Sequence, residues 1–260
     1  MKTRHVLTCA LALGLMPVFA EDAPPEAAEK LPSAEEVLDK ALEAGGGKAA
    51  FEKVKSLEEV ATATLPKQNI TMHATTLCKG PHCCYTTSEV PGMFKQEQAF
   101  DGKTGWAKDP MNGLRDLSPE EVTQIRQGTL ASWDWKDTFE KAELARKDKV
   151  GDAEAYVVVL TPKVGHPVTR WYDAKSFLLL REDGTEVSPN GEAKKSSRYL
   201  DYQVVEGLRL PSEIRTVSSG VEAVIKITSR RFNLEIPDSR FAKPKEEAGE
   251  DGAGEKGEAP

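Results

Sequence analysis

Side chains able to bind a soft metal or form a disulfide gather in one short stretch: Cys78, His82, Cys83 and Cys84. Cys78 and Cys83 flank a Lys-Gly-Pro-His loop, which places them opposite each other when the flanking residues form a hairpin. In an oxidising compartment such a pair favours a disulfide, so we predict a Cys78–Cys83 bond. Neighbouring strand residues point to opposite faces, which leaves Cys84 unpaired, and a register shifted by one residue exchanges Cys83 and Cys84.

A metal site is the sharper alternative for the same stretch. Thiolate ligands suit Cu(I) or Zn, and His73 lies a few residues upstream of the cluster. However, strand geometry separates the adjacent Cys83 and Cys84, and the sequence has no Cys-x-x-Cys pair. We predict no metal site and no cofactor, and metal handling stays a third hypothesis.

Motifs for catalysis are absent from the sequence. It contains no nucleophile elbow, no phosphate-binding loop and no His-Glu-x-x-His helix. Beyond the first twenty residues the only histidines are His73, His82 and His166, and His166 lies in a predicted Gly-His-Pro turn. We therefore predict no catalytic residues and a protein that is not an enzyme.

The first twenty residues have the three parts of a secretory signal. Lys2 and Arg4 give a positive start, an apolar stretch runs from residue 6 to 18, and small residues surround a cleavage position after Ala20. The apolar stretch falls short of the ~20 residues of a membrane helix, and no other run approaches that length. Cys9 precedes most of the apolar stretch, which makes it a poor lipidation site. We predict a signal peptide over 1–20, export to the periplasm and no transmembrane segment.

Charge and composition bound the rest of the chain. The sequence has 35 Lys and Arg against 42 Asp and Glu, and loss of the signal peptide makes the balance more acidic still. Such a chain is not suited to binding nucleic acid or an anionic membrane surface. Residues 21–32 are rich in proline and acids, and 243–260 in Lys, Glu, Gly and Ala. We predict a flexible N-terminal segment, a disordered acidic tail and one folded domain over 33–242.

The predicted domain combines few helices with many strands. Capping boxes that start at Ser33 and Ser118 predict an N-terminal helix and one inserted helix. The remainder alternates in short runs between turn dipeptides such as Asp183-Gly184, which predicts about a dozen antiparallel strands. Residues 156–160 and 177–180 are apolar on both sides, so the middle of the sheet is covered on both faces or curls around an interior. We predict an α+β fold in which a large curled antiparallel sheet, an incomplete β-barrel, is capped by the two helices.

Several short segments occur in an order that is typical of one protein family. They are Ala44-Gly45-Gly46, Lys79-Gly80-Pro81, residues 100–106, Asp173-Ala174 before Leu178-Leu179-Leu180-Arg181, Asp201-Tyr202, residues 207–211 and residues 241–244. With this order the chain resembles the LolA/LolB family of outer-membrane lipoprotein-sorting proteins, and its broader bacterial relatives more than the carrier itself. The stretch 100–106 is the most specific, and the resemblance spans essentially the whole predicted domain.

The resemblance implies a half-barrel, lidded by helices, with a hydrophobic cavity that shelters acyl chains. The family's carrier has a hallmark arginine that helps to hold its lid shut. No motif here marks its counterpart, and Arg115, Arg126 and Arg146 are the nearby candidates.

Apolar side chains near the inserted helix and in the doubly apolar strands could line such a cavity. We select Trp133, Trp135, Val158, Leu160, Leu178 and Leu180. Burial of each methylene contributes about 0.8 kcal/mol, so an apolar cavity can hold a lipid without any special residue. Ordinary core packing is the alternative for every one of these residues.

The leading functional hypothesis is a non-catalytic periplasmic carrier or binding protein for lipid or lipoprotein acyl chains. The alternative is an envelope protein-interaction or stress-sensor domain with a filled core and a protein partner. The sequence does not choose among shuttle, receptor and sensor.

Overall fold

The computed structural model describes residues 31–245. The predicted signal peptide lies outside these residues, as do nearly all of segment 21–32 and most of the tail 243–260. The chain divides into two compact units, residues 1–31 and residues 32–260. The fold described below is that of the second unit. Within the described residues, no helix is long and apolar enough to cross a membrane.

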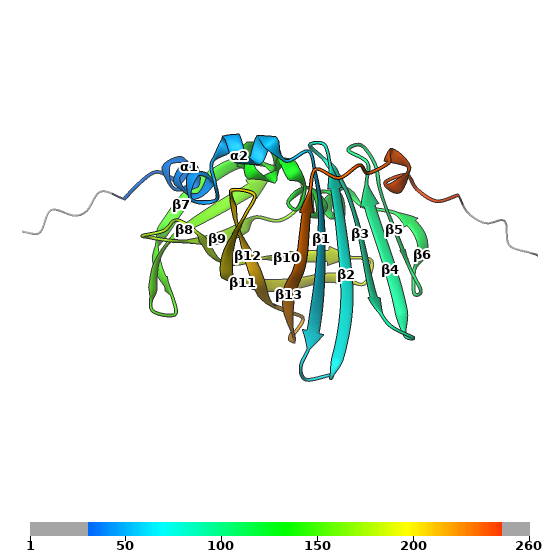
Figure 1. The fold of residues 1–260 in the computed structure, drawn as a ribbon. Helices are drawn as coiled ribbons and strands as arrows, with labels where there is room; N and C mark the ends of the chain where they lie inside the picture. Colours follow the sequence, from blue (N-terminus) through cyan, green and yellow to red (C-terminus); the bar gives the residue numbers. More distant parts are fainter. Residues whose placement is uncertain (1–30, 246–260) are drawn as a thin grey trace, which may run out of the picture. The chain divides into compact units, whose positions relative to one another are not determined.

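Six short helical elements and thirteen strands make up the described part of the chain (Figure 1). The helical elements are α1 (Ala34–Ala44), α2 (Lys48–Lys53), α3 (Pro119–Arg126), the 3-10 helix η1 (Leu130–Trp133), α4 (Trp135–Thr138) and the 3-10 helix η2 (Asp238–Arg240). The strands are β1 (Ser56–Leu65), β2 (Ile70–Lys79), β3 (Cys83–Val90), β4 (Phe94–Phe100), β5 (Gly105–Asp109), β6 (Gly113–Asp116), β7 (Phe139–Val150), β8 (Ala153–Pro162), β9 (Val168–Asp173), β10 (Leu179–Ser188), β11 (Gly191–Val205), β12 (Leu208–Ser218) and β13 (Val221–Phe232).

All thirteen strands belong to one antiparallel sheet with the order β6-β5-β4-β3-β2-β1-β13-β12-β11-β10-β9-β8-β7. The chain forms one meander from β1 to β6 and a second from β7 to β13. The first and last strands, β1 and β13, pair in the middle of the sheet. Strands β6 and β7 are the two edges, and they do not pair, so the sheet is not closed into a barrel. The predicted α+β fold with a large antiparallel sheet is confirmed.

The connection between the two edge strands requires the sheet to curl. In a flat 13-stranded sheet the twelve spacings of about 4.8 Å would place β6 and β7 about 58 Å apart. Residues 117–138, hereafter the bridging segment, contain α3, η1 and α4 and reach at most about 45 Å in this form. The edges must therefore approach each other. Figure 1 shows the strands turning along the sheet, so that β10 runs across the direction of β2.

Local irregularities in the ladders accompany this curvature. Register shifts interrupt the β1–β13 pair, the β9–β10 pair and, twice, the β7–β8 pair. Each extra residue bends its strand and increases the local right-handed twist. The curl is therefore built into several places along the sheet.

Helix α1 covers one end of the curled sheet. The Ser33 hydroxyl accepts from the Glu36 amide, and the Glu36 carboxylate accepts from the Ser33 amide, which confirms the predicted capping box. Val37 and Leu38 then project into an apolar cluster with Leu160 and other residues of β7–β9. This stripe of aliphatic side chains fixes α1 to the sheet.

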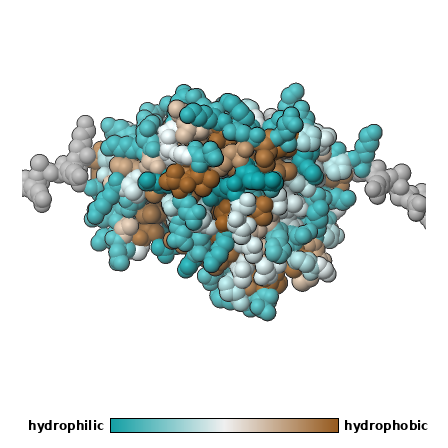
Figure 2. Space-filling model, in the orientation of Figure 1, coloured by the Kyte–Doolittle hydropathy of each residue, from teal (hydrophilic) through white to brown (hydrophobic). Residues whose placement is uncertain are grey.

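The C-terminal segment after β13 covers the opposite face of β3–β5. Ile236 and Phe241 are buried against Tyr85 and Trp106. The Trp106 indole Nε1 donates to the Phe241 carbonyl oxygen at 3.0 Å. A second apolar cluster therefore lies on the outer side of the sheet. In the view of Figure 2, hydrophilic residues cover most of the surface and interrupt its hydrophobic patches.

Two sequence predictions about strands are wrong. The dipeptide Asp183-Gly184 is not a turn, because β10 continues through it and pairs with both β9 and β11. The chain reverses instead at Pro189-Asn190, where the Ser188 hydroxyl donates to the Gly191 carbonyl oxygen. Strand β6 was not predicted, since its four residues are too few to show an alternating pattern.

Candidate functional site

The inner face of the sheet is the face that the bridging segment crosses. Cys78 and Cys84 identify it, because the Cys78 sulfur lies 3.7 Å from the carbonyl oxygen of Gly128 in the bridging segment. The same face continues through Ala61, which pairs with Ala74, and across the sheet to β10. Helix α3 lies against β10, so the inner face of β10 and the bridging segment face each other.

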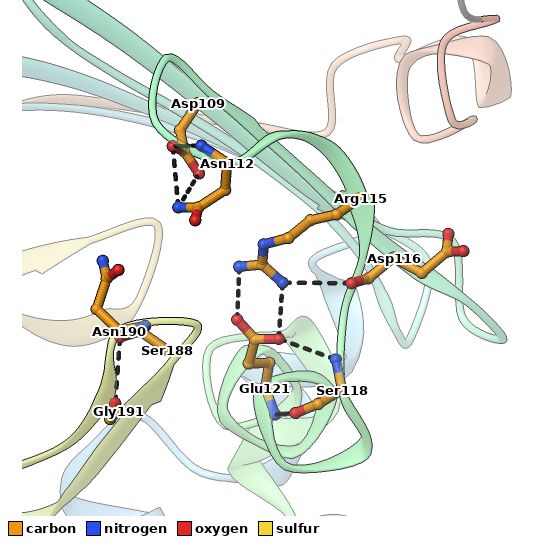
Figure 3. A network of polar contacts seen from close by, with 9 residues as sticks. All are labelled: Asp109, Asn112, Arg115, Asp116, Ser118, Glu121, Ser188, Asn190 and Gly191. Carbon is orange, nitrogen blue, oxygen red and sulfur yellow. Dashed lines mark hydrogen bonds and ion pairs between the residues drawn. The ribbon is translucent and has the colours of Figure 1, made fainter.

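Two adjoining hollows lie between the bridging segment and the inner face. The smaller, about 230 Å³, separates α3 from β10 and β11. The larger and more open one, about 860 Å³, lies between the β6–α3 junction and the β10–β11 turn, the region drawn in Figure 3. Both are lined by Glu120, Gly165, His166 and Val187, so they form one continuous cleft.

Helix α3 presents polar side chains to this cleft. Those that line the smaller hollow are Glu120, Thr123, Gln124 and Gln127. Across from them stand Glu182 and Gly184 of β10 and Lys195 of β11. Because none of these α3 side chains is aliphatic, the helix does not fill the space beneath it as α1 does.

An ion pair fixes α3 to the edge of the sheet. The Arg115 guanidinium of β6 donates to both carboxylate oxygens of Glu121, at 2.9 and 2.7 Å, while the Ser118 amide donates to one of them (Figure 3). Burial raises the pKa of Glu121, but the hydrogen bonds from Arg115 and Ser118 outweigh burial and hold this pKa below its ordinary value. The first turn of α3 is thereby tied to β6.

A largely buried ion pair forms part of the inner face at the cleft. Arg170 Nε donates to Glu182 Oε2 at 2.7 Å, and the Tyr199 hydroxyl lies 3.5 Å from Glu182 Oε1. Burial lowers the pKa of Arg170, but the negative charge of Glu182 more than offsets this and holds the pKa above its ordinary value. Burial, followed by the charge of Glu182, raises the pKa of Tyr199 well above its ordinary value. The Arg170 guanidinium therefore stays charged beside a neutral tyrosine.

Two pairs of hydroxyl side chains on the inner face satisfy each other. Thr76 and Thr86 hydroxyls lie 3.2 Å apart, and the Ser197 hydroxyl donates to Thr216 at 3.1 Å. Paired hydroxyls leave methyl groups to face the interior, next to alanines such as Ala61. At these two places the inner face presents no hydroxyl without a partner.

The β2–β3 hairpin corrects the disulfide prediction. The bond joins Cys78 to Cys84, with their Cα atoms 4.2 Å apart, and Cys83 is the free cysteine. The loop between the strands has three residues, Gly80 to His82, so Cys84 faces Cys78 and Cys83 faces Lys79. The predicted register was wrong by one residue, which moved the pairing from one face of the strand to the other.

The hairpin loop also contacts the bridging segment. The Pro81 carbonyl oxygen accepts from the Ala131 amide at 2.9 Å. His82 Nδ1 lies 3.6 Å from the Asp137 carboxylate, which also accepts from Arg126. These contacts fasten the bridging segment to the hairpin.

The six predicted cavity residues occupy three different places. Val158 and Leu160 are completely buried in the cluster under α1, and Trp135 packs against that cluster. Trp133 stacks on Phe51. Leu178 lies in the β9–β10 connection, where its carbonyl oxygen accepts from the Asp173 amide.

The sixth candidate, Leu180, packs in a separate cluster with Val157 and Trp171. None of the six lines the two hollows. Their role in ligand binding stays a prediction.

Two of the three candidate arginines hold the bridging segment. Arg115 binds Glu121, and Arg126 donates to the carbonyl and carboxylate oxygens of Asp137, joining α3 to α4. Arg146 pairs with Asp148 on β7, away from the bridging segment. Sequence reasoning missed the cleft-lining residues of α3 and β10, because only the curl of the sheet brings them together. The one available signal was the polar composition of the capped helix over 119–126.

No metal centre is found in the part of the chain that the structure describes. Among residues 31–245 no three His, Cys, Asp or Glu side chains are placed to hold a metal ion. The cleft instead offers a partly enclosed space that is lined largely by polar side chains.

Comparison with solved structures places this architecture among known folds. A LolA superfamily protein from Nitrosomonas europaea is 20% identical, with a TM-score of 0.57 over 82% of this chain and 99% of its own. A domain described as an outer membrane lipoprotein-sorting protein, from Vibrio parahaemolyticus, is 14% identical, with a TM-score of 0.53 over 81% of this chain and 97% of its own.

A DUF1329 family protein from Desulfovibrio piger is 16% identical, with a TM-score of 0.53 over 80% of this chain and 97% of its own. At these identities the likeness concerns the fold. No protein-family model and no curated protein matches the sequence.

Proposed function

We propose, from the LolA-like fold that this chain has, that it is an exported protein that binds the acyl chains of lipids or lipoproteins without catalysis. The observation that carries the proposal is the cleft between the bridging segment and the inner face. Its larger hollow of about 860 Å³ falls within the range of about 300–1,000 Å³ that is common for small-molecule sites. The outer-membrane sorting domain from Vibrio parahaemolyticus shares the same architecture.

The energetics of such binding require only apolar burial. About a dozen methylenes withdrawn from water contribute roughly 10 kcal/mol before the costs of association are subtracted. On the inner face of β2 and β3 the Thr76 and Thr86 hydroxyls are already paired, so an acyl chain that covers them leaves neither without a partner. We propose that the acyl chain lies along this inner face, with its polar end in the cleft.

The charge of the cleft limits which lipid headgroup can bind there. Six carboxylates line the two hollows, and three of them are paired with Arg115, Arg170 and Lys243. The other three face only Lys195 and the imidazole of His166, so the lining keeps an excess of negative charge. An anionic headgroup is repelled by such a lining. We propose a neutral or zwitterionic lipid as ligand.

A cleft-filling variant tests the proposal. Gly184 lines the smaller hollow, and a Cβ built there meets only Val168 Cγ2, at 3.8 Å. Gly184→Phe therefore fills the hollow without straining the backbone, and phenylalanine suits a strand. Thr169→Phe, on the neighbouring strand but outside the cleft, is the matched control. Binding is measured with a zwitterionic phospholipid that carries a fluorescent acyl chain, and bound lipid is identified by mass spectrometry of natively purified protein.

We expect Gly184→Phe to weaken lipid binding at least tenfold and Thr169→Phe to leave it unchanged. Absence of lipid from natively purified wild-type protein, together with no binding of the fluorescent lipid, would contradict the proposal. Equal binding by wild type and Gly184→Phe would place the ligand elsewhere, with Val158 and Leu160 under α1 as the next candidates.

One observation favours the alternative of a protein-interaction domain. The region under α1 is filled, since Val37, Val158 and Leu160 have no exposed surface. A wild-type protein that binds no lipid but captures a defined envelope protein would support that alternative.

A further inference from the structure

The β2–β3 hairpin loop is connected to three separate parts of the chain. It contacts the bridging segment through Pro81, His82 and Cys78, as described above. The Gly80 amide donates to the Lys55 carbonyl oxygen at 2.9 Å, which ties the loop to the segment after α2. Lys79 Nζ donates to Ile236 O at 2.8 Å and pairs with the Asp238 carboxylate. The position of this loop therefore determines how firmly the bridging segment is held.

The disulfide at the base of the loop lies beneath the bridging segment. Cys78 is 1% exposed and Cys84 is 5% exposed. The Gly128 carbonyl oxygen, between α3 and η1, lies 3.7 Å from the Cys78 sulfur. A reductant reaches these sulfurs only after the bridging segment moves away from the sheet.

We propose that the Cys78–Cys84 disulfide is a redox-controlled clamp on the bridging segment: oxidised, it keeps the segment closed over the cleft, and reduced, it releases the segment. The effect on the bridging segment stands on the contacts above, whereas its effect on ligand access rests on the proposed function. The reductant is a dithiol, either a small molecule or a protein with a Cys-x-x-Cys site.

The chemistry balances with this single co-reactant. A thiolate of the dithiol attacks one sulfur, the Cys78–Cys84 bond breaks and a mixed disulfide forms. The second thiol of the reductant then attacks the mixed disulfide and displaces the protein sulfur, and the reductant leaves as an internal disulfide. Two electrons and two protons pass to the protein, which ends with thiols at Cys78 and Cys84.

Packing links the redox state to the bridging segment. Two separate thiols occupy more space than one bonded pair, and the site has almost no exposed surface into which they can expand. The sulfurs must therefore press against the Gly128 carbonyl or separate the two strands. By linkage, any condition that lifts the bridging segment also exposes the disulfide, so the two events favour each other.

Cys83 does not take part in this clamp. It lies on the opposite face of β3, where its thiol donates to the Asp101 carbonyl oxygen. Burial raises the pKa of Cys83, which keeps it a poor nucleophile at neutral pH. Its replacement by serine therefore gives a clean background for the experiment.

Hydrogen exchange of the full chain tests the clamp. The Cys83→Ser protein is compared in its oxidised form and after reduction with dithiothreitol. We expect amides in residues 128–138 to exchange at least tenfold faster after reduction, with the amides of β5 and β9 unchanged. Cys83→Ser combined with Cys78→Ser and Cys84→Ser should exchange as the reduced form does and should not respond to dithiothreitol.

Equal exchange in residues 128–138 before and after reduction would overturn the proposal. Faster exchange over the whole sheet would overturn it as well, because the disulfide would then support the entire domain and not the bridging segment. Binding of the zwitterionic fluorescent phospholipid, measured in parallel, separates the two proposals. If neither redox form binds the lipid, the proposed function fails, while the exchange result still decides the clamp.

Discussion

The two ends of the inner face are covered by helices of opposite character. Under α1, Val37 and Leu38 pack against β8 and β9, and Leu160 has no exposed surface. Under α3, the residues that face β10 are polar, and a cleft remains. Both helices begin with a complete capping box, so their starts are equally well specified. The side chains on the buried face decide whether a helix closes a core or leaves a hollow.

The largest expected effect on stability comes from a substitution that creates a cavity under α1. Leu160→Ala should lower the free energy of unfolding by about 3–4 kcal/mol, because it removes a completely buried side chain from a filled cluster. Urea unfolding measures this loss, and Val164→Ala, at an exposed position, is the control. Lipid binding should be unchanged if the ligand lies under the bridging segment. Weaker binding with unchanged stability would show that the contrast between the two regions is wrong.

The buried ion pair at the cleft offers the next test. Glu182→Leu should cost about 2–3 kcal/mol, because it leaves the Arg170 guanidinium buried without its carboxylate. Adding Arg170→Met should recover most of that loss, since a pair of apolar side chains needs no partner. Urea unfolding of the two single variants and the double variant gives the coupling free energy. Purely additive costs would indicate that Glu182 and Arg170 do not stabilise each other and would contradict this prediction.

As the pH falls, the attachment of α3 to β6 should weaken before the packing of α1 on the sheet does. The lowered pKa of Glu121 means that its contribution to stability is present above the ordinary glutamate value of 4.5 and is lost as pH falls through the lower folded-state pKa. Arg115→Met should cost about 1–2 kcal/mol at neutral pH and flatten the decline of stability below pH 4.5. Thermal unfolding across pH 3–7, with exposed Lys149→Met as control, checks this. An unchanged acid profile in Arg115→Met would remove Glu121 from the explanation.

The smallest expected effects on stability are those of alanine substitutions at two glycines. A Cβ at Gly105 would lie 2.7 Å from Leu117 Cδ1 and 3.2 Å from the Ala99 carbonyl oxygen, so Gly105→Ala should destabilise by about 1 kcal/mol. Gly184→Ala should instead stabilise by about 0.5 kcal/mol, because its φ suits any residue and its neighbour is 3.8 Å away. Thermal unfolding distinguishes the two signs.

Features that depend on local sequence could be predicted, and those that depend on distant pairing could not. The capping boxes at Ser33 and Ser118 use residues three apart, and both helices begin where the pattern places them. Asp183-Gly184 has the local chemistry of a turn, but pairing of Asp183 with Thr169 and with Ser196 overrides it. The Cys78 partner depends on the length of a loop, which differs by one residue from the predicted one.

The cleft could not be predicted at all from local pattern. Its walls come from Glu120 on α3, His166 in the β8–β9 connection and Gly184 on β10. These residues meet only because the sheet curls far enough for the bridging segment to cross it. Leu160 and Val158, predicted as cavity residues, are completely buried, so the strongest hydrophobic signal marks the filled region and not the hollow one.

The pairing of β1 with β13 has a consequence for the order in which the protein can assemble. Leu57 in β1 pairs with Phe232 in β13, so the central seam of the sheet joins the earliest strand to the latest. Within its own meander each of these two strands has only one neighbour, β2 for β1 and β12 for β13, and its other edge stays unpaired until the two meet. Contacts so distant along the chain form slowly. The sheet can therefore be completed only after β13, its last strand in the sequence, has been synthesised.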